Sequence, residues 1–173
     1  GLIRTGQGLE ELFDFLRGHD DCRLSLIGVG QRAYVAELQA LLKQIGIGDR
    51  VFFPNRFYSE TELLDVARTC HVGIALCDTG PDNFTHYADP GKVKAYSEMH
   101  LPVVMTRISD IVPFVERLKC GEVICRGPEI GEALERIRGD YESYQVGVHR
   151  FVEYFHYDRY YREAFKVLEE VWR

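Results

Sequence analysis

The chain has 173 residues, of which 46% are hydrophobic, and a formal net charge of -6. This length and apolar content predict a single domain with one buried core. Because the charges are interspersed, they argue against general binding to nucleic acid or to anionic membranes, although a local basic pocket remains compatible with them. No apolar run approaches the roughly 18 residues of a membrane-spanning helix, and the glycine-rich start at 1–8 does not look like a signal peptide.

The cysteines predict a reducing environment. Their number is odd and no Cys-x-x-Cys pair occurs, a pattern that favours reduced thiols over disulfides. We therefore expect a cytoplasmic protein in which most cysteines pack as small apolar side chains. They are Cys22, Cys70, Cys77, Cys120 and Cys125.

Apolar periodicity and turn residues predict alternating helices and strands in the first half. Ser59 and Glu62 have the spacing of a capping box, which opens a helix. In chain order we expect a loop over 1–8, a helix over 9–18, a strand over 23–29, a helix over 34–46, a strand over 51–53, a helix from 59 to 67 and a strand over 72–76.

A polar segment, 77–89, then separates a strand from a helix. Its roughly dozen residues exceed the usual length of such a connection, and long loops in α/β domains are more often functional than structural. Beyond it we expect a helix from 90 to 101, a strand over 103–105, a helix capped by Ser109 and running to 118, a strand over 122–125, a helix over 128–137 and a helical, aromatic-rich tail over 140–173.

The helix after this segment begins with the features of an anion site. Asp89 can cap it, and Pro90 fits its first position, where no amide hydrogen is needed. Gly91 lets a ligand approach the backbone, while the free amides, the helix dipole and the Lys92 ammonium all favour a phosphate. The alternative is a solvated lysine with no ligand, the commonest fate of this residue type.

About five alternations of short apolar strands with helices predict an α/β fold, a doubly wound parallel sheet of the Rossmann-like kind with helices on both faces. Ligands of such sheets bind at the carboxyl ends of the strands. The residues expected at that edge are Gly28, Gly30, Asn55, Arg56, the 77–89 segment, Gly91 and Lys92.

The turn at 28–33 also matches Gly-x-Gly-x-x-Ala, the fingerprint of dinucleotide-binding proteins. An NAD site needs an acidic residue about 20 positions further on, whereas the next strand here ends at Asn55 without a carboxylate. The fingerprint strand is also expected to be the first of its domain, and here a helix precedes it. An NAD-binding oxidoreductase domain is therefore an alternative, and a turn that admits a sugar diphosphate is the preferred interpretation.

The stretch from Pro90 to Val104 resembles the Pro-x-Lys-(Leu/Val)-x-Glu-Tyr-x-x-x-Gly-x-Pro-Val-Val segment in the C-terminal, donor-binding domain of GT-B glycosyltransferases of the group 1 or family 4-like kind. The glycine turn, the 51–53 strand and the strand start at 69–72 resemble the same family, so the likeness covers nearly the whole chain as a pattern. The matching residues of the segment are Pro90, Lys92, Val93, Tyr96, Pro102, Val103 and Val104.

This resemblance implies a domain that binds a nucleoside-diphosphate sugar for transfer to an acceptor hydroxyl, in polysaccharide or glycolipid synthesis. It adds Arg4, His86 and Tyr87 to the candidate donor contacts. The family's paired glutamates would fall at Tyr87 and Ala95, and its helix-end glycine at His100. No cofactor is implied. The acidic and histidine residues of the 77–89 segment have no standard metal-ligand spacing, so no metal is expected.

The resemblance also implies that the chain, 1–173, is one donor-binding domain with a helical tail at 140–173, and that the acceptor-binding N-terminal domain lies outside it. The family's first strand would precede Gly1, which would leave a gap between the strands that begin at Arg23 and Val72. The tail has more aromatic residues than one face can bury, so part of it is expected to cover another domain. The full enzyme is compatible with peripheral membrane association.

Two interpretations of the missing glutamates stay open. The chain is either a divergent donor-binding domain that relies on Lys92 and the 77–89 segment, or a non-catalytic α/β interaction or regulatory domain that has lost its ligand. The sequence does not identify the nucleotide, the sugar, the acceptor or the stereochemical outcome.

Overall fold

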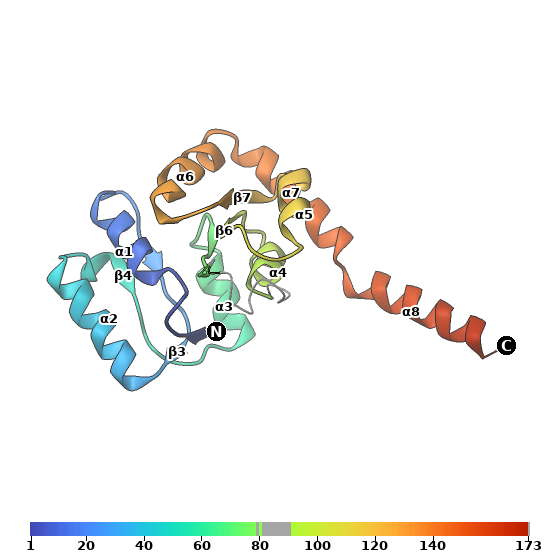
Figure 1. Cartoon of the computed structure of the whole chain (residues 1–173), viewed down its shortest axis with the longest axis horizontal. Coiled ribbons are helices and arrows are strands. Elements are labelled where there is room, and N and C mark those ends of the chain that lie inside the picture. Colours follow the sequence, from blue (N-terminus) through green and yellow to red (C-terminus); the bar gives the residue numbers. More distant parts are fainter. Residues whose placement is uncertain (79, 81–90, 173) are drawn as a thin grey trace.

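The computed structural model describes residues 1–78, 80 and 91–172 (Figure 1). Its strands are β1 (Leu2–Ile3), β2 (Leu24–Ser25), β3 (Val29–Gly30), β4 (Val51–Phe52), β5 (Gly73–Ala75), β6 (Val103–Thr106) and β7 (Gly121–Ile124). Its helices are α1 (Leu9–Arg17), α2 (Arg32–Gln44), α3 (Glu60–Ala67), α4 (Gly91–Glu98), α5 (Val112–Leu118), α6 (Ile130–Gly139), α7 (Tyr141–Tyr154) and α8 (Tyr157–Val171), with short 3-10 turns at Gly48–Arg50 and Gly127–Glu129.

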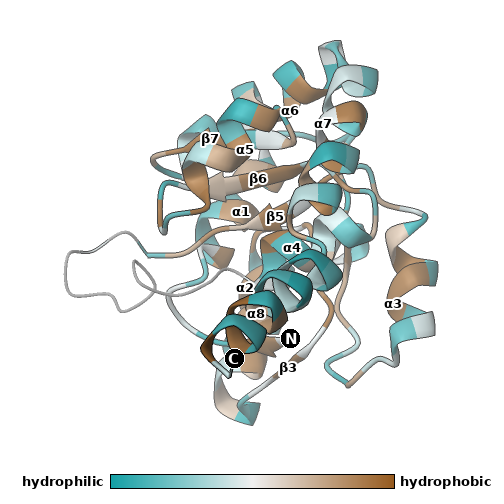
Figure 2. Ribbon diagram, turned by 90° about the vertical axis from the view of Figure 1, so that its right-hand side faces the viewer, coloured by the Kyte–Doolittle hydropathy of each residue, from teal (hydrophilic) through white to brown (hydrophobic). Residues whose placement is uncertain are grey.

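All described strand pairs are parallel, as expected for a doubly wound sheet. In the N-terminal half β1 pairs with β3 and β2 pairs with β4; in the C-terminal half the order is β5-β6-β7. β6 is buried along its whole length, and Figure 2 shows β5 and β6 as apolar ribbons among helices that mix polar and apolar residues.

Alternation along β6 builds a core on each face of the sheet. Val103 and Met105 pack with residues of α4, α5 and α7, including Phe151, while Val104 packs with residues of α1 and α6. A separate cluster, centred on the fully buried Phe13, joins α1, α2, β1 and β4. The expected α/β fold, with helices on both faces of a parallel sheet, is confirmed.

The N-terminal loop and the second strand differ from expectation. Leu2 and Ile3, expected in a loop, form β1 beside β3, and the backbone N–H of Val29 donates to the carbonyl of Gly1 at 3.1 Å. The expected strand over 23–29 is two short strands with different partners, because the chain leaves β4 after Leu26 and turns toward β1. In the described part of the chain, β2 and β5 are not paired with each other, as predicted.

The helix expected to be capped by Ser109 begins later. Ile111 is its N-cap, and Pro113 lies in its first turn. Ser109 instead has a φ of 65°, a left-handed conformation, so its hydroxyl does not cap the helix in the usual way. The capping box at Ser59 and Glu62 is present, as predicted. Asp89 and Pro90, expected to open α4, lie outside the described residues.

The C-terminal end of α4 is closed by a Schellman motif. The N–H of Leu101 donates to the carbonyl of Tyr96, and the N–H of His100 donates to the carbonyl of Ser97, both at 2.9 Å. His100 is the left-handed residue of this motif, with a φ of 60°. Glycine usually occupies that position because it lacks a Cβ.

The aromatic tail divides into two different helices. α7 contributes Tyr144, Val148 and Phe151 to the cores. α8 has no buried residue and projects from the body of the molecule in Figure 1.

Candidate functional site

Three segments meet at the carboxyl edge of the sheet, between its two halves. They are the loop that follows β1, the end of β5 and the start of α4. The N–H of Asp78 donates to the carbonyl of Gly6 at 2.9 Å, which joins the first two. Gly8 lies against Leu76 so closely that a Cβ there would come within 2.7 Å of that side chain. This edge is where a doubly wound sheet binds its ligands.

Lys92 and Arg4 bring two positive charges to this edge. The side chain of Lys92 is exposed, yet desolvation by the surrounding protein lowers its pKa. The nearby Cys77 raises this pKa, and the positive charge of Arg4 lowers it. Lys92 forms no ion pair or hydrogen bond with another described residue. Two positive charges that lie near each other favour the binding of an anion.

Cys77 lies within the electric field of both cations. Burial raises the pKa of its thiol, while Lys92 and Arg4 lower it. Its backbone is fixed by one side chain, since its N–H donates to Oγ1 of Thr106 at 3.0 Å and its carbonyl accepts from the same hydroxyl at 3.1 Å. Cys77 therefore occupies a defined position near Lys92 and Arg4.

The glycine turn serves the packing of β1 in the described structure. A Cβ on Gly28 would overlap the backbone of Gly1, and one on Gly30 would come within 2.9 Å of the carbonyl oxygen of Ile3. The N–H of Gly30 donates to Oδ1 of Asn55 at 3.1 Å, so this amide already has a partner. Asn55 itself has a left-handed φ of 45°. A direct ligand contact by these residues stays a prediction.

Arg56 is engaged with neighbours on the surface. Its guanidinium is 2.6 Å from a carboxylate oxygen of Glu62 and lies 3.8 Å from the centre of the Tyr58 ring. Arg56 and two hydrogen bonds from Ser59 lower the pKa of Glu62 to about 2, so the pair stays charged at neutral pH.

His86 and Tyr87 lie outside the described residues, as do Asp82 and Asp89. Ala95, at the position of one of the family's glutamates, is partly buried on α4 and brings no carboxylate to the site. Within the described ranges, no three His, Cys, Asp or Glu side chains lie close enough together to hold a metal ion.

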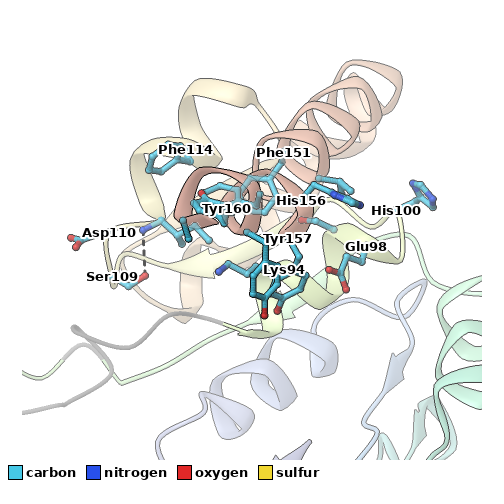
Figure 3. Close-up of a pocket in the computed structure, with 16 residues that line it drawn as sticks. Lys94, Glu98, His100, Ser109, Asp110, Phe114, Phe151, His156, Tyr157 and Tyr160 are labelled. Atoms are coloured by element: carbon cyan, nitrogen blue, oxygen red, sulfur yellow. Dashed lines mark hydrogen bonds between the residues drawn. The ribbon is translucent and has the colours of Figure 1, made fainter. Parts of the chain in front are cut away.

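A second feature, an apolar groove of about 890 Å³, lies between α4, α5, α7 and α8. Figure 3 shows Lys94, Phe151 and Tyr157 gathered around it, and the Lys94 ammonium is 5.5 Å from the centre of the Phe155 ring. Lys94 thus lines the groove, two residues after Lys92.

Sequence reasoning missed two contacts that shape the site, those of Thr106 with Cys77 and of Asn55 with Gly30. Each joins residues that are far apart in the chain, so no local pattern indicates its partner. The sequence shows only that Thr106 is a hydroxyl residue at the end of an apolar strand and that Asn55 directly follows a Pro. Neither feature indicates a partner.

No family model and no curated protein sequence matches the chain. Several solved structures share its fold. The C-terminal domain of a group 1 family glycosyltransferase (LpcC) from Francisella tularensis has a TM-score of 0.66 and 16% sequence identity, over 90% of this chain and 82% of that one. Among the described residues, no helix has both the length and the apolar content needed to cross a membrane.

Two larger proteins contain the same fold as one part of their chains. Sucrose-phosphate synthase from Thermosynechococcus elongatus matches with a TM-score of 0.74 and 16% identity over 98% of this chain and 43% of its own. HepE from Anabaena, solved in complex with UDP, matches with a TM-score of 0.74 and 16% identity over 98% of this chain and 47% of its own. The chain therefore spans less than half the length of these two proteins, and it has the fold of the C-terminal domain of GT-B glycosyltransferases.

Proposed function

We propose that the chain is the donor-binding domain of a glycosyltransferase, and that it binds the diphosphate of a nucleotide sugar at the Arg4 and Lys92 edge. The observation that carries this proposal is that Arg4, directly after β1, and Lys92, at the start of α4, come together at the ligand-binding edge of this fold, close enough for the charge of Arg4 to lower the pKa of Lys92. The UDP bound to HepE, a protein of the same fold, supports the choice of ligand.

The proposed chemistry is electrostatic. When a sugar leaves a nucleoside diphosphate, negative charge grows on the departing phosphate oxygens. The Lys92 ammonium and the first amides of α4 would stabilise that charge more strongly than the charge of the bound donor, which lowers the barrier to transfer. This mechanism uses no cofactor and no metal ion.

An acceptor-binding N-terminal domain is the proposed partner. Tyr157, Tyr160 and Tyr161 of α8 are exposed and line the apolar groove together with Phe155 of the turn before α8. Covering these rings would remove a large apolar surface from water. We propose that this surface meets the N-terminal domain, and that the isolated chain binds the donor without transferring its sugar.

The proposal extends to the acceptor and to the cellular setting. We propose a hexose donor and an acceptor hydroxyl on a growing polysaccharide or glycolipid, handled in the cytoplasm by a peripheral enzyme. The free cysteines fit a reducing compartment.

A thermal-shift panel tests the ligand class. The chain is heated alone and with UDP, ADP, GDP, UDP-glucose or NAD, each at 1 mM. Because ligand binding to the native state raises Tm, at least one nucleoside diphosphate is expected to stabilise the chain more than NAD does. The same ligand should lose its effect on Lys92→Ala. A rise in Tm with NAD alone would indicate the dinucleotide alternative.

The second candidate is a non-catalytic interaction domain. It is favoured by Ala95, which brings no carboxylate, and by the exposed face of α8. No rise in Tm with any member of the panel would favour this function over the transferase.

A further inference from the structure

The chain just after β5 is held by a side chain of the neighbouring strand β6. The β5–β6 ladder has its last pair at Ala75 and Met105. Two residues on, the hydroxyl of Thr106 accepts from the N–H of Cys77 and donates to its carbonyl. One side chain therefore forms hydrogen bonds with both backbone groups of a residue that follows the neighbouring strand.

This contact is suited to fixing the backbone tightly. Thr106 is only 3% exposed. Its hydroxyl both donates a hydrogen bond to Cys77 and accepts one from it. Without the hydroxyl, two polar backbone groups in a partly buried place would lack these bonds, which is costly. A side chain of similar shape without the hydroxyl, such as valine, would not hold Cys77 in place.

The fixed segment lies near both cations of the proposed anion site. The residue after Cys77 donates its N–H to Gly6, in the loop that carries Arg4. Cys77 itself shares an electrostatic environment with Lys92 and Arg4. Movement of the segment that follows β5 would therefore shift the Arg4 loop relative to Lys92.

We propose that Thr106 is a positioning residue for the diphosphate site, which it shapes by clamping Cys77 and, through Asp78, the Arg4 loop. Thr106 acts through the backbone and does not touch the ligand. The choice of ligand in this inference rests on the proposed function. The role of Thr106 in holding the backbone rests on the hydrogen bonds described above.

The test compares Thr106→Val, Thr106→Ser and Tyr144→Phe with the unchanged chain. The valine variant keeps the shape and loses the hydroxyl, whereas the serine variant keeps the hydroxyl. Tyr144→Phe is the control for general loss of stability, because it removes a buried hydroxyl that donates to Glu122 at the opposite, amino end of β7. Calorimetric titration with inorganic pyrophosphate measures the site in each protein.

Thr106→Val is expected to bind pyrophosphate about 3- to 10-fold more weakly, the range for loss of well-formed hydrogen bonds. Thr106→Ser and Tyr144→Phe should bind within about 2-fold of the unchanged chain. Equal affinity in the valine variant, or equal weakening in Tyr144→Phe, would overturn the proposal. If Thr106→Val does not fold, Thr106→Cys replaces it, since a thiol is a weaker donor and acceptor than a hydroxyl.

A second measurement keeps this inference separate from the proposed function. The pKa of Lys92 is measured by NMR in ligand-free protein with labelled lysines, using Lys92→Arg for assignment. Thr106→Val should move that pKa, while Thr106→Ser should leave it unchanged. If the unchanged chain does not bind pyrophosphate, the proposed function fails, and an unchanged pKa of Lys92 in Thr106→Val would then also reject the role of Thr106.

Discussion

Lys92 is the side chain on which the proposed ligand site depends most. Its surroundings lower its pKa, chiefly through desolvation and then through Arg4. The folded state therefore disfavours the charged form, which is the form that a phosphate needs. Such a conflict between local stability and charge is typical of functional positions.

The first prediction concerns the stability of ligand-free Lys92→Met. A lysine whose pKa is lower in the folded state than in the unfolded state destabilises the fold while it is charged, and this effect fades as pH rises through the folded pKa toward 10.5. The methionine variant should therefore have a slightly higher Tm at pH 7, with a smaller difference at pH 10. Lys166→Met on exposed α8 is the control and should change Tm little at either pH. A lower Tm for Lys92→Met at pH 7 would show that Lys92 is structural.

The second prediction concerns His100, the left-handed residue that closes α4. A non-glycine residue pays a steric cost in this conformation, so His100→Gly should raise the free energy of unfolding by about 0.5–1 kcal/mol. His100→Ala is the matched control, since it also loses the ring contact with His149 but keeps the Cβ. Urea unfolding at pH 7 measures both. Equal stability of the two variants would contradict this explanation.

At the scale of elements, the sequence predicts what depends on local pattern. The apolar periodicity of α1 and α2, the apolar run of β6 and the capping box of α3 each lie within one segment, and each was found near its expected place. The α/β fold followed from their alternation. These features are local because periodicity and capping require only neighbouring residues.

The elements that were missed depend on distant partners. β1 has only two residues and exists because β3 lies beside it, so Leu2 and Ile3 alone carry no strand pattern. Ser109 looked like a helix cap but takes a left-handed conformation in a turn after β6. Within the site, Lys92 could be chosen from its segment, whereas the bonds of Thr106 and Asn55 required the fold.

The third prediction tests whether α8 is independent of the body. Phe165 is 60% exposed, whereas Phe151 of α7 is 1% exposed. Phe165→Ser should therefore change the free energy of unfolding by less than about 0.5 kcal/mol, while Phe151→Ala should cost about 3–5 kcal/mol. Urea unfolding of the isolated chain measures both. A loss of more than about 2 kcal/mol in Phe165→Ser would mean that α8 packs against its own domain.

At the scale of the whole molecule, two parallel half-sheets carry the site between them. Arg4 comes from the N-terminal half and Lys92 from the C-terminal half, and the bond between Gly6 and Asp78 joins the halves at this point. The projecting α8 and the apolar groove lie on the C-terminal half (Figures 1 and 3). The arrangement fits a domain that binds its donor at one edge and meets a partner domain through its tail.

The most direct test of a diphosphate site at Lys92 is calorimetric titration of the chain and of Lys92→Ala. The ligand is UDP, or whichever nucleoside diphosphate raises Tm most, at one fixed low salt concentration. A charged hydrogen bond to phosphate contributes about 1.5–3 kcal/mol. Lys92→Ala should therefore weaken binding about 10- to 150-fold, while Lys166→Ala should match the unchanged chain. Equal affinity of Lys92→Ala and the unchanged chain would contradict the assignment of this site.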